Sequence, residues 1–235
     1  MFIAFRVRST HHFFKFLFAV NAGSNSLSMF KINELEPTEL RLVGMPVDTQ
    51  GDFPVAVAFS PKMNLACVVN GGAADGVACF NVDENKGLVP VPNTIRALSL
   101  NQTTPPTGPP NTVSDIIFSE DDTKLLVSVK GIPPTPGRIS AFDVNPVDCS
   151  LSETSVDSTP SEGGVVPFSM TNIPGKNAVL NTDAAVGFAV YDFSKGANIA
   201  ATSSIIPIAG QGATCWSNFS PKTGTFFLTV SPPFD

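Results

Sequence analysis

Histidine, charge and long apolar runs are all scarce in this chain of 235 residues, which has two His, 14 Lys and Arg, and 20 Asp and Glu. Both His stand near the start, at His11 and His12, so no later imidazole is present for metal binding or proton transfer. The net charge is −6 and no segment carries a Lys/Arg cluster, which argues against nucleic-acid binding. No apolar stretch approaches the ~20 residues of a membrane span. We therefore expect no nucleic-acid partner, no membrane span, no metal and no cofactor.

The composition favours many short strands. Charged residues make up only 14% of the chain and hydrophobic residues 43%, with 21 Pro and 18 Gly. Strands joined by turns suit this balance, whereas long amphipathic helices would need more Glu, Lys, Ala and Leu. The length allows one large all-β domain and does not require two.

Four cysteines are present, at Cys67, Cys79, Cys149 and Cys215, and none belongs to a C-x-x-C pair. Without such pairs or nearby His, a zinc site is not expected. Four Cys allow three disulfide pairings, which the sequence leaves open. Buried free thiols in strands are the favoured interpretation.

Two segments match the acceptor pattern for N-glycosylation, Asn101-Gln102-Thr103 and Asn218-Phe219-Ser220. The first lies in a Pro-rich loop, where it can be used. The second lies in a strand-like repeat, where we do not expect modification.

A short apolar run that ends in a polar residue recurs about every 50 residues. These runs end at Asn21, Asn70, Lys130, Asn181 and Ser231. A second element follows each of the first four runs, with an aromatic residue at the same place: Phe30, Phe80, Phe142 and Tyr191. Gly-rich or Pro-rich turns separate the two elements, which predicts hairpins.

A further strand-like element precedes each hairpin and a weaker one follows it, as residues 55–59 and 88–91 do around the hairpin of 65–83. Four strands per unit of this length predict the blade of a β-propeller. Residues 65–69 are apolar at successive positions, as expected of a strand buried on both faces. The predicted fold is an all-β propeller of four-stranded antiparallel blades, incomplete at about four and a half blades.

The predicted organisation is an atypical N-terminal segment over residues 1–12 and a partial propeller over 13–235. Residues 1–12 stand where the inner strand of the first blade belongs, with Arg6, Arg8, His11 and His12 where apolar residues are expected. A propeller closes its ring or leaves strand edges open. We therefore expect a fragment of a larger, seven-bladed protein, with closure into four blades as the alternative.

At these repeats, and especially from Gly212 to Gly224, the chain resembles a fungal group of lactonase-type seven-bladed propellers. This group is known as 3-carboxymuconate cyclase-like, and the repeat resembles the YVTN type. The resemblance covers residues 16–235. It implies an isomerase that converts a carboxymuconate to a lactone, or lactone hydrolysis in sister groups. Many members look secreted, so the resemblance implies an extracellular location, with a cytoplasmic one left open.

The chain departs from that group in its chemistry. The resemblance implies catalysis by His, Glu and Arg groups in the central pocket. This chain has no His after His12, and its later Arg residues are Arg41, Arg96 and Arg138. No catalytic position is matched, so no catalytic residue is assigned and whether the chain is an enzyme is left open.

The candidate ligand-binding residues are Asn70, Lys130, Arg138, Asn181 and Asp183. The first runs of a propeller's blades end on one face around the axis, so Asn70, Lys130 and Asn181 are expected to form part of a polar ring there. The alternative is that each Asn bonds its own turn. Lys130 and Arg138 flank one hairpin loop and can jointly meet a carboxylate, or be solvated cations. Asp183 is a candidate base or metal ligand, or a turn residue.

The single Trp216 is expected in the core, with the wall of a central channel as the alternative. The predicted function is a lactonase or carboxymuconate cyclase-like propeller that binds a small acidic or lactone ligand. The alternative is a non-catalytic scaffold or secreted surface protein with a protein partner.

Overall fold

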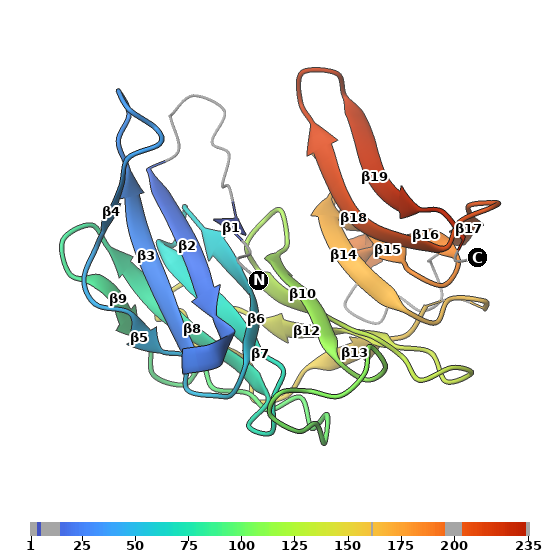
Figure 1. Ribbon diagram of the computed structural model, residues 1–235, viewed down its shortest axis with the longest axis horizontal. Coiled ribbons are helices and arrows are strands. Elements are labelled where there is room, and N and C mark those ends of the chain that lie inside the picture. Colours follow the sequence, from blue (N-terminus) through green and yellow to red (C-terminus); the bar gives the residue numbers. More distant parts are fainter. Residues whose placement is uncertain (1–3, 6–14, 161, 196–203, 234–235) are drawn as a thin grey trace. The chain divides into compact units, whose positions relative to one another are not determined.

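The computed structural model describes residues 4–5, 15–160, 162–195 and 204–233, which form strands, loops and two short 3-10 helices (Figure 1). The all-β prediction is confirmed. The chain divides into two compact units, residues 1–106 with 145–151, and residues 107–144 with 152–235. No helix in the described ranges is long and apolar enough to cross a membrane.

The first unit holds two antiparallel sheets. One consists of β1 (Ala4–Phe5), β2 (Phe16–Asn21), β3 (Ser26–Ile32) and β4 (Leu40–Leu42), with β5 (Val47–Asp48) also paired to β3 and the 3-10 helix η1 (Ala22–Ser24) after β2. The other consists of β6 (Pro54–Ser60), β7 (Leu65–Asn70), β8 (Gly76–Asp83) and β9 (Gly87–Pro90).

The second unit holds three sheets. The first consists of β10 (Val113–Phe118), β11 (Lys124–Val129), β12 (Arg138–Asp143) and β13 (Val156–Ser158). The second consists of β14 (Pro167–Asn172), β15 (Ala178–Asp183), β16 (Gly187–Asp192) and β17 (Ser204–Pro207), with η2 (Phe193–Lys195) after β16. The third is the hairpin of β18 (Ala213–Ser220) and β19 (Thr225–Ser231).

Strands follow one another across each sheet in chain order, apart from β5, which pairs with β3, and this order confirms the predicted blades. We call β1, β6, β10, β14 and β18, the first strand of each sheet, the inner strands. Most of the segment 1–12 lies outside the described residues. Its residues Ala4 and Phe5, however, pair with Phe18 and Ala19 of β2, and so take the place of the inner strand that the sequence did not reveal.

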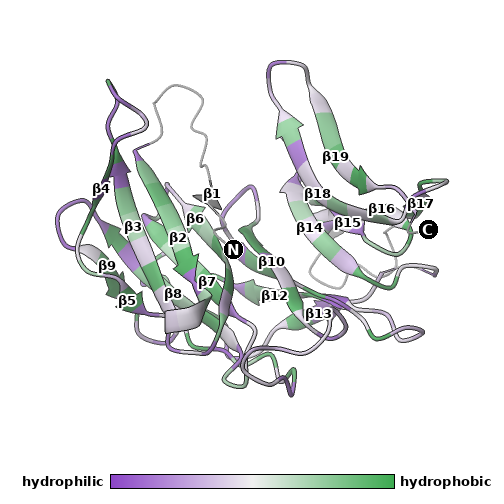
Figure 2. Cartoon of the chain, in the orientation of Figure 1, coloured by the Kyte–Doolittle hydropathy of each residue, from purple (hydrophilic) through white to green (hydrophobic). Residues whose placement is uncertain are grey.

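The cores lie within and between the sheets of each unit. Every residue of β7 is buried, as the unbroken apolar run predicts. The repeated aromatic position is buried in three of its four occurrences, with Phe80, Phe142 and Tyr191 at most 1% exposed, whereas Phe30 is partly exposed. Figure 2 shows hydrophobic residues within many of the strands. Burying one such side chain contributes roughly 1.5–3 kcal/mol to folding.

The strand register corrects the alignment of the polar run ends. Asn70, Val129 and Asp183 occupy the same place, since each pairs with the first residue of its inner strand (Pro54, Val113 and Pro167). The ends of the apolar runs predict instead that Asn70 aligns with Lys130 and Asn181. The difference arises because residues 181–183 are all polar, so the end of the apolar run does not mark the end of the strand.

The cysteine prediction is wrong for one pair. Cys67 of β7 and Cys79 of β8 are directly opposite each other and form a disulfide, with both residues 0% exposed. Cys149 and Cys215 are free thiols and partly exposed.

Four inner strands, β6, β10, β14 and β18, contain a β-bulge in the same part of the strand, between Pro54 and Ala56 in β6 and at the matching places in the others. A bulge adds one residue to one strand and turns the local side chains in a new direction. The bulges therefore decide which side chains the inner strands present.

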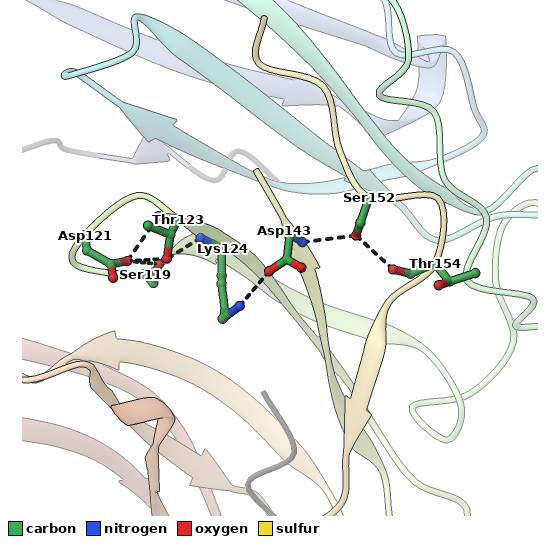
Figure 3. A network of polar contacts seen from close by, with 7 residues as sticks. All are labelled: Ser119, Asp121, Thr123, Lys124, Asp143, Ser152 and Thr154. Carbon is green, nitrogen blue, oxygen red and sulfur yellow. Dashed lines mark hydrogen bonds and ion pairs between the residues drawn. The ribbon is translucent and has the colours of Figure 1, made fainter. Parts of the chain in front are cut away.

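Polar side chains stabilise the turn between β10 and β11, at residues 119–124 (Figure 3). The Asp121 carboxylate accepts hydrogen bonds from the Ser119 hydroxyl and from Thr123, at 2.7 to 3.1 Å. Lys124 forms an ion pair with Asp143 at 2.6 Å. This network has a structural role in closing the turn, and Lys124 provides a lysine with a carboxylate partner for comparison with Lys130.

Candidate functional site

Two aromatic side chains meet at the bulges of β14 and β18. Phe168 lies in the bulge between Pro167 and Met170, and Trp216 in the bulge between Thr214 and Ser217. Their ring centroids are 5.1 Å apart with an edge-to-face angle of 79°. Both residues are partly exposed, so they form an aromatic wall that is not closed off in the core.

Lys130 reaches this wall from the end of β11. Its Nζ donates to Thr112 Oγ1 at 3.0 Å and to the Val113 carbonyl at 3.2 Å. The same ammonium lies 5.1 Å from the centroid of the Phe168 ring, within range of a cation–π interaction. We call the cluster of Lys130, Phe168, Cys215 and Trp216 the bulge site.

The burial of Lys130 disfavours the charged form of its side chain. Burial lowers the pKa of the ammonium to about 8, while the electrostatic interaction with Cys215 acts in the opposite direction. Within the described ranges, no carboxylate forms an ion pair with Lys130. The pKa shift caused by burial makes Lys130 a candidate functional residue.

A line of polar side chains runs beside the bulge site across β10, β14 and β18. Ser169 and Thr171 of β14 contact the Ser217 hydroxyl of β18, with oxygen–oxygen distances of 3.3 and 2.7 Å. On the other side, Asp115 of β10 accepts the Met170 N–H at 2.8 Å and takes a further hydrogen bond from the Ser169 hydroxyl. We call Asp115, Ser169, Thr171 and Ser217 the polar seam, and it ties three inner strands together.

Asp115 is 2% exposed, and burial raises the pKa of its carboxyl to about 7. The backbone N–H groups of Met170 and Ile116 and the Ser169 hydroxyl oppose that rise by bonding to the carboxylate. Its two oxygens are thus engaged by the protein, which suits a role in holding strands more than contact with a ligand.

Asn181 and Asp183 support the backbone of β14 and the loop before it. Asn181 donates to the Ser169 carbonyl at 3.0 Å. The Asp183 carboxylate accepts the N–H groups of Val165, Val166 and Ala185 at 2.7 to 3.0 Å. Both residues are 1% exposed, so the structure places their side chains behind the site, where they fix the strand that carries Phe168.

Asn70 and Arg138 contact residues outside the bulge site. Asn70 belongs to the first unit, where its amide donates to the Thr49 carbonyl at 3.1 Å. Arg138 pairs with Asp157 of β13 at 3.1 Å, whereas Lys130 bonds toward the start of β10. The two cations that flank the hairpin loop therefore have different partners.

Sequence reasoning did not single out Phe168, Cys215, Asp115 or the hydroxyls of the polar seam. A bulge breaks the alternation of a strand by one residue, and the loose match of residues 166–170 to the repeat was the available signal. Trp216, expected in the core, is partly exposed against Phe168.

Two further observations concern metal binding and a hollow in the first unit. No group of three or more His, Cys, Asp or Glu in those ranges is arranged to hold a metal ion. A hollow of about 850 Å³ lies along β3 and β4, with Lys31 and Arg41 in its lining, and none of the predicted site residues borders it.

No family model and no curated protein matches the chain. Solved structures do match. A candidate 6-phosphogluconolactonase from Bacteroides fragilis is 17% identical, with 96% of this chain and 62% of that one covered and a TM-score of 0.65. The periplasmic gluconolactonase of Pseudomonas aeruginosa is 14% identical, with 92% and 60% covered and a TM-score of 0.63. The chain has the fold of a β-propeller.

The same fold likeness extends to a protein-binding propeller. Sqt1 from Chaetomium thermophilum, bound to the N-terminus of the ribosomal protein L10, is 13% identical, with 87% of this chain and 49% of that one covered and a TM-score of 0.56. The chain thus spans 49% to 62% of the length of these three structures. At such identities the likeness concerns the fold, and function has to be argued from the site.

Proposed function

We propose that the chain binds a small acidic or lactone ligand at the bulge site, with the Lys130 ammonium in contact with the carboxylate or the lactone carbonyl. The observation that carries the proposal is the half-buried ammonium without a carboxylate partner among the described residues. Burying a charge is unfavourable unless it is paired, so an anion that pairs with Lys130 gains binding energy there.

The hydrogen bonds of Lys130 support this role. An ammonium has three N–H donors, and the contacts to Thr112 and Val113 use two of them. The third donor is left for an acceptor oxygen of a ligand. The two existing bonds hold Nζ in place, so little side-chain entropy is lost when a ligand binds.

The aromatic wall supports a ligand with a flat or apolar portion. Phe168 and Trp216 present partly exposed rings next to the ammonium. A lactone ring combines a carbonyl oxygen for Lys130 with a hydrocarbon face for the rings. This combination fits the ligand class implied by the resemblance to the 3-carboxymuconate cyclase-like propellers.

Turnover of such a ligand needs a group that exchanges a proton near neutral pH. Lys130, with a pKa of about 8, is such a group, and its Nζ lies 5.1 Å from the centroid of the Phe168 ring. We therefore name Lys130 as the residue to test for lactone hydrolysis as well as for binding.

The test is ligand-induced thermal stabilisation with glucono-δ-lactone and gluconate as probes, together with an assay for lactone hydrolysis. Variant K130M removes the charge and K130R keeps it. As a matched control, K124M removes a cation that is paired with Asp143 at the other end of β11. We expect at least one probe to raise the Tm of the wild type and of K124M, with the rise lost in K130M and partly kept in K130R. A ligand at 100 times its Kd stabilises by roughly 2.7 kcal/mol.

Two outcomes contradict the proposal. Equal stabilisation of the wild type and K130M would place binding elsewhere. Absence of any effect by either probe up to millimolar concentration would exclude these ligands as models of the natural one and remove the support for a lactone.

We also propose an extracellular location. The Cys67–Cys79 disulfide supports it, because disulfides persist in oxidising compartments and are rare in the cytosol. Peptide mapping of protein from its native source without reductant is the measurement, and reduced Cys67 and Cys79 there would contradict the location.

A further inference from the structure

The first acceptor motif for N-glycosylation lies on the surface of the first unit, in the loop between β9 and β10. Asn101 is exposed, has a left-handed backbone with φ of 54°, and belongs to no strand. Thr103, the hydroxyl residue of the motif, is also exposed. An acceptor asparagine must be accessible and outside a strand ladder, and Asn101 meets both conditions.

Bonds on either side hold this loop in place. Before the motif, the backbone N–H groups of residues 98–100 donate to the Asp75 carboxylate at 2.6 to 2.9 Å, and Leu100 is 1% exposed. After it, the Thr104 hydroxyl donates to Asp52 at 3.1 Å. The motif is thus a short outward segment between two anchored points, and a group attached to Asn101 would not displace the core.

The same unit carries an independent sign of the compartment in which N-glycosylation takes place. Cys67 and Cys79 form a fully buried disulfide in the sheet whose last strand, β9, leads into this loop. Disulfides form in the oxidising secretory pathway, where the sugar donor is also found. The two features therefore agree on one route through the cell.

We infer that Asn101 is an N-glycosylation site. The donor is an oligosaccharide linked through a diphosphate to a polyprenyl lipid, and a transferase catalyses the reaction. The Asn101 side-chain nitrogen forms a bond to the anomeric carbon of the first sugar. The bond from that carbon to the diphosphate oxygen breaks, and the lipid diphosphate leaves with the electron pair. One amide proton is released to a base, so no oxidant or reductant is required.

The second motif is a matched internal comparison. Asn218 is also exposed, but it lies in β18 and pairs with Phe227 of β19. A backbone segment that is hydrogen-bonded in a β-ladder cannot enter the active site of the glycosyl transferase, whereas a loop outside a ladder can. We therefore expect modification at Asn101 and not at Asn218.

The experiment expresses the full chain behind a cleavable secretory leader in a eukaryotic host. Glycosylation is measured on the total cellular and secreted protein by the mass lost on treatment with peptide N-glycosidase, so the result does not depend on efficient secretion. Variants N101Q and T103A destroy the first motif, T103S preserves it, and N218Q destroys the second.

We expect one enzyme-sensitive glycan in the wild type, T103S and N218Q, and none in N101Q and T103A. A wild type without an enzyme-sensitive mass would overturn the inference, as would a glycan that persists in N101Q and disappears in N218Q. Peptide mapping of the same samples reports whether Cys67 and Cys79 are joined. Ligand binding at Lys130 is measured separately, so either proposal can fail alone.

Discussion

The Asp115 carboxylate of β10 accepts the backbone N–H of Met170 in β14 at 2.8 Å, which joins the inner strands of two successive blades. Burial raises the pKa of Asp115 to about 7, from an ordinary value of 3.8. The folded state thus holds this proton more tightly than the unfolded state. The resulting stabilisation is complete below about pH 4 and is lost as the pH rises through about 7.

Urea unfolding between pH 4 and pH 8 tests this linkage. We expect the free energy of unfolding of the wild type to fall over that range by as much as about 4 kcal/mol more than that of D115N, at about 1.4 kcal/mol for each pKa unit. The control D143N changes an exposed carboxylate that pairs with Lys124 and should keep the wild-type slope. An unchanged slope in D115N would show that another group titrates.

Tyr191 carries a buried hydroxyl for which the described residues supply no partner. Phe80 and Phe142 occupy the same place in two other blades. We expect Y191F to leave stability unchanged or raise it by about 1 kcal/mol, since the variant removes an unsatisfied polar group. The reverse change, F142Y, should destabilise by roughly 1–3 kcal/mol. Thermal unfolding measures both, and a clear loss of stability in Y191F would reveal a partner for the hydroxyl.

The Cys67–Cys79 bond closes a loop with a sequence separation of 12 residues. By loop entropy alone, the double variant C67A/C79A should lose about 3 kcal/mol. The double variant C149A/C215A, which removes the free thiols, should lose much less. Thiol titration of the denatured protein should find two thiols before reduction and four after it. Four thiols before reduction would contradict the bond.

The Asp183 carboxylate is the acceptor for three backbone N–H groups in the loops that flank β14 and β15. D183A leaves these donors without their partner and should lower the free energy of unfolding by roughly 2–4 kcal/mol. D183N keeps one acceptor oxygen and should lose less. Equal stability of D183A and the wild type would mean that water replaces the carboxylate.

Anion binding at the bulge site should weaken above pH 8. Burial lowers the pKa of Lys130 to about 8, so the ammonium loses its proton as the pH rises past that value. We expect the affinity for gluconate, measured by calorimetry, to fall about tenfold per pH unit well above the pKa. In K130R the affinity should stay level to pH 10, because arginine keeps its charge. A level profile in the wild type would exclude Lys130 as the anion contact.

The blades could be predicted from the sequence because two local patterns repeat in it. The unbroken apolar run of 65–69 indicates a strand buried on both faces. The repeated aromatic at Phe80, Phe142 and Tyr191 marks the register of the second strand of each hairpin. The Cys67–Cys79 pairing was also within reach, because a hairpin centred on the turn of residues 71–75 places these residues opposite each other.

The site could not be predicted in the same way. Asp115 and Met170 are 55 residues apart in the chain, and Ser169 and Ser217 are 48 apart, so no local pattern links them. The bulges also change the direction of Phe168 and Trp216 by adding a residue that the repeat does not show. Of the five predicted residues, Lys130 has its side chain at the bulge site, while Asn181 and Asp183 hold the backbone behind it.

The hydrogen bond from the Met170 N–H to Asp115 makes hydrogen exchange at this amide a measure of the separation of two blades. Most strand amides are protected by the ladder of their own sheet, and they exchange with solvent only when that sheet opens. The Met170 amide instead donates to a side chain of the neighbouring sheet. Its hydrogen-exchange rate therefore follows the parting of two blades, and a comparison with amides inside either sheet shows whether the blades open singly or as one cooperative body.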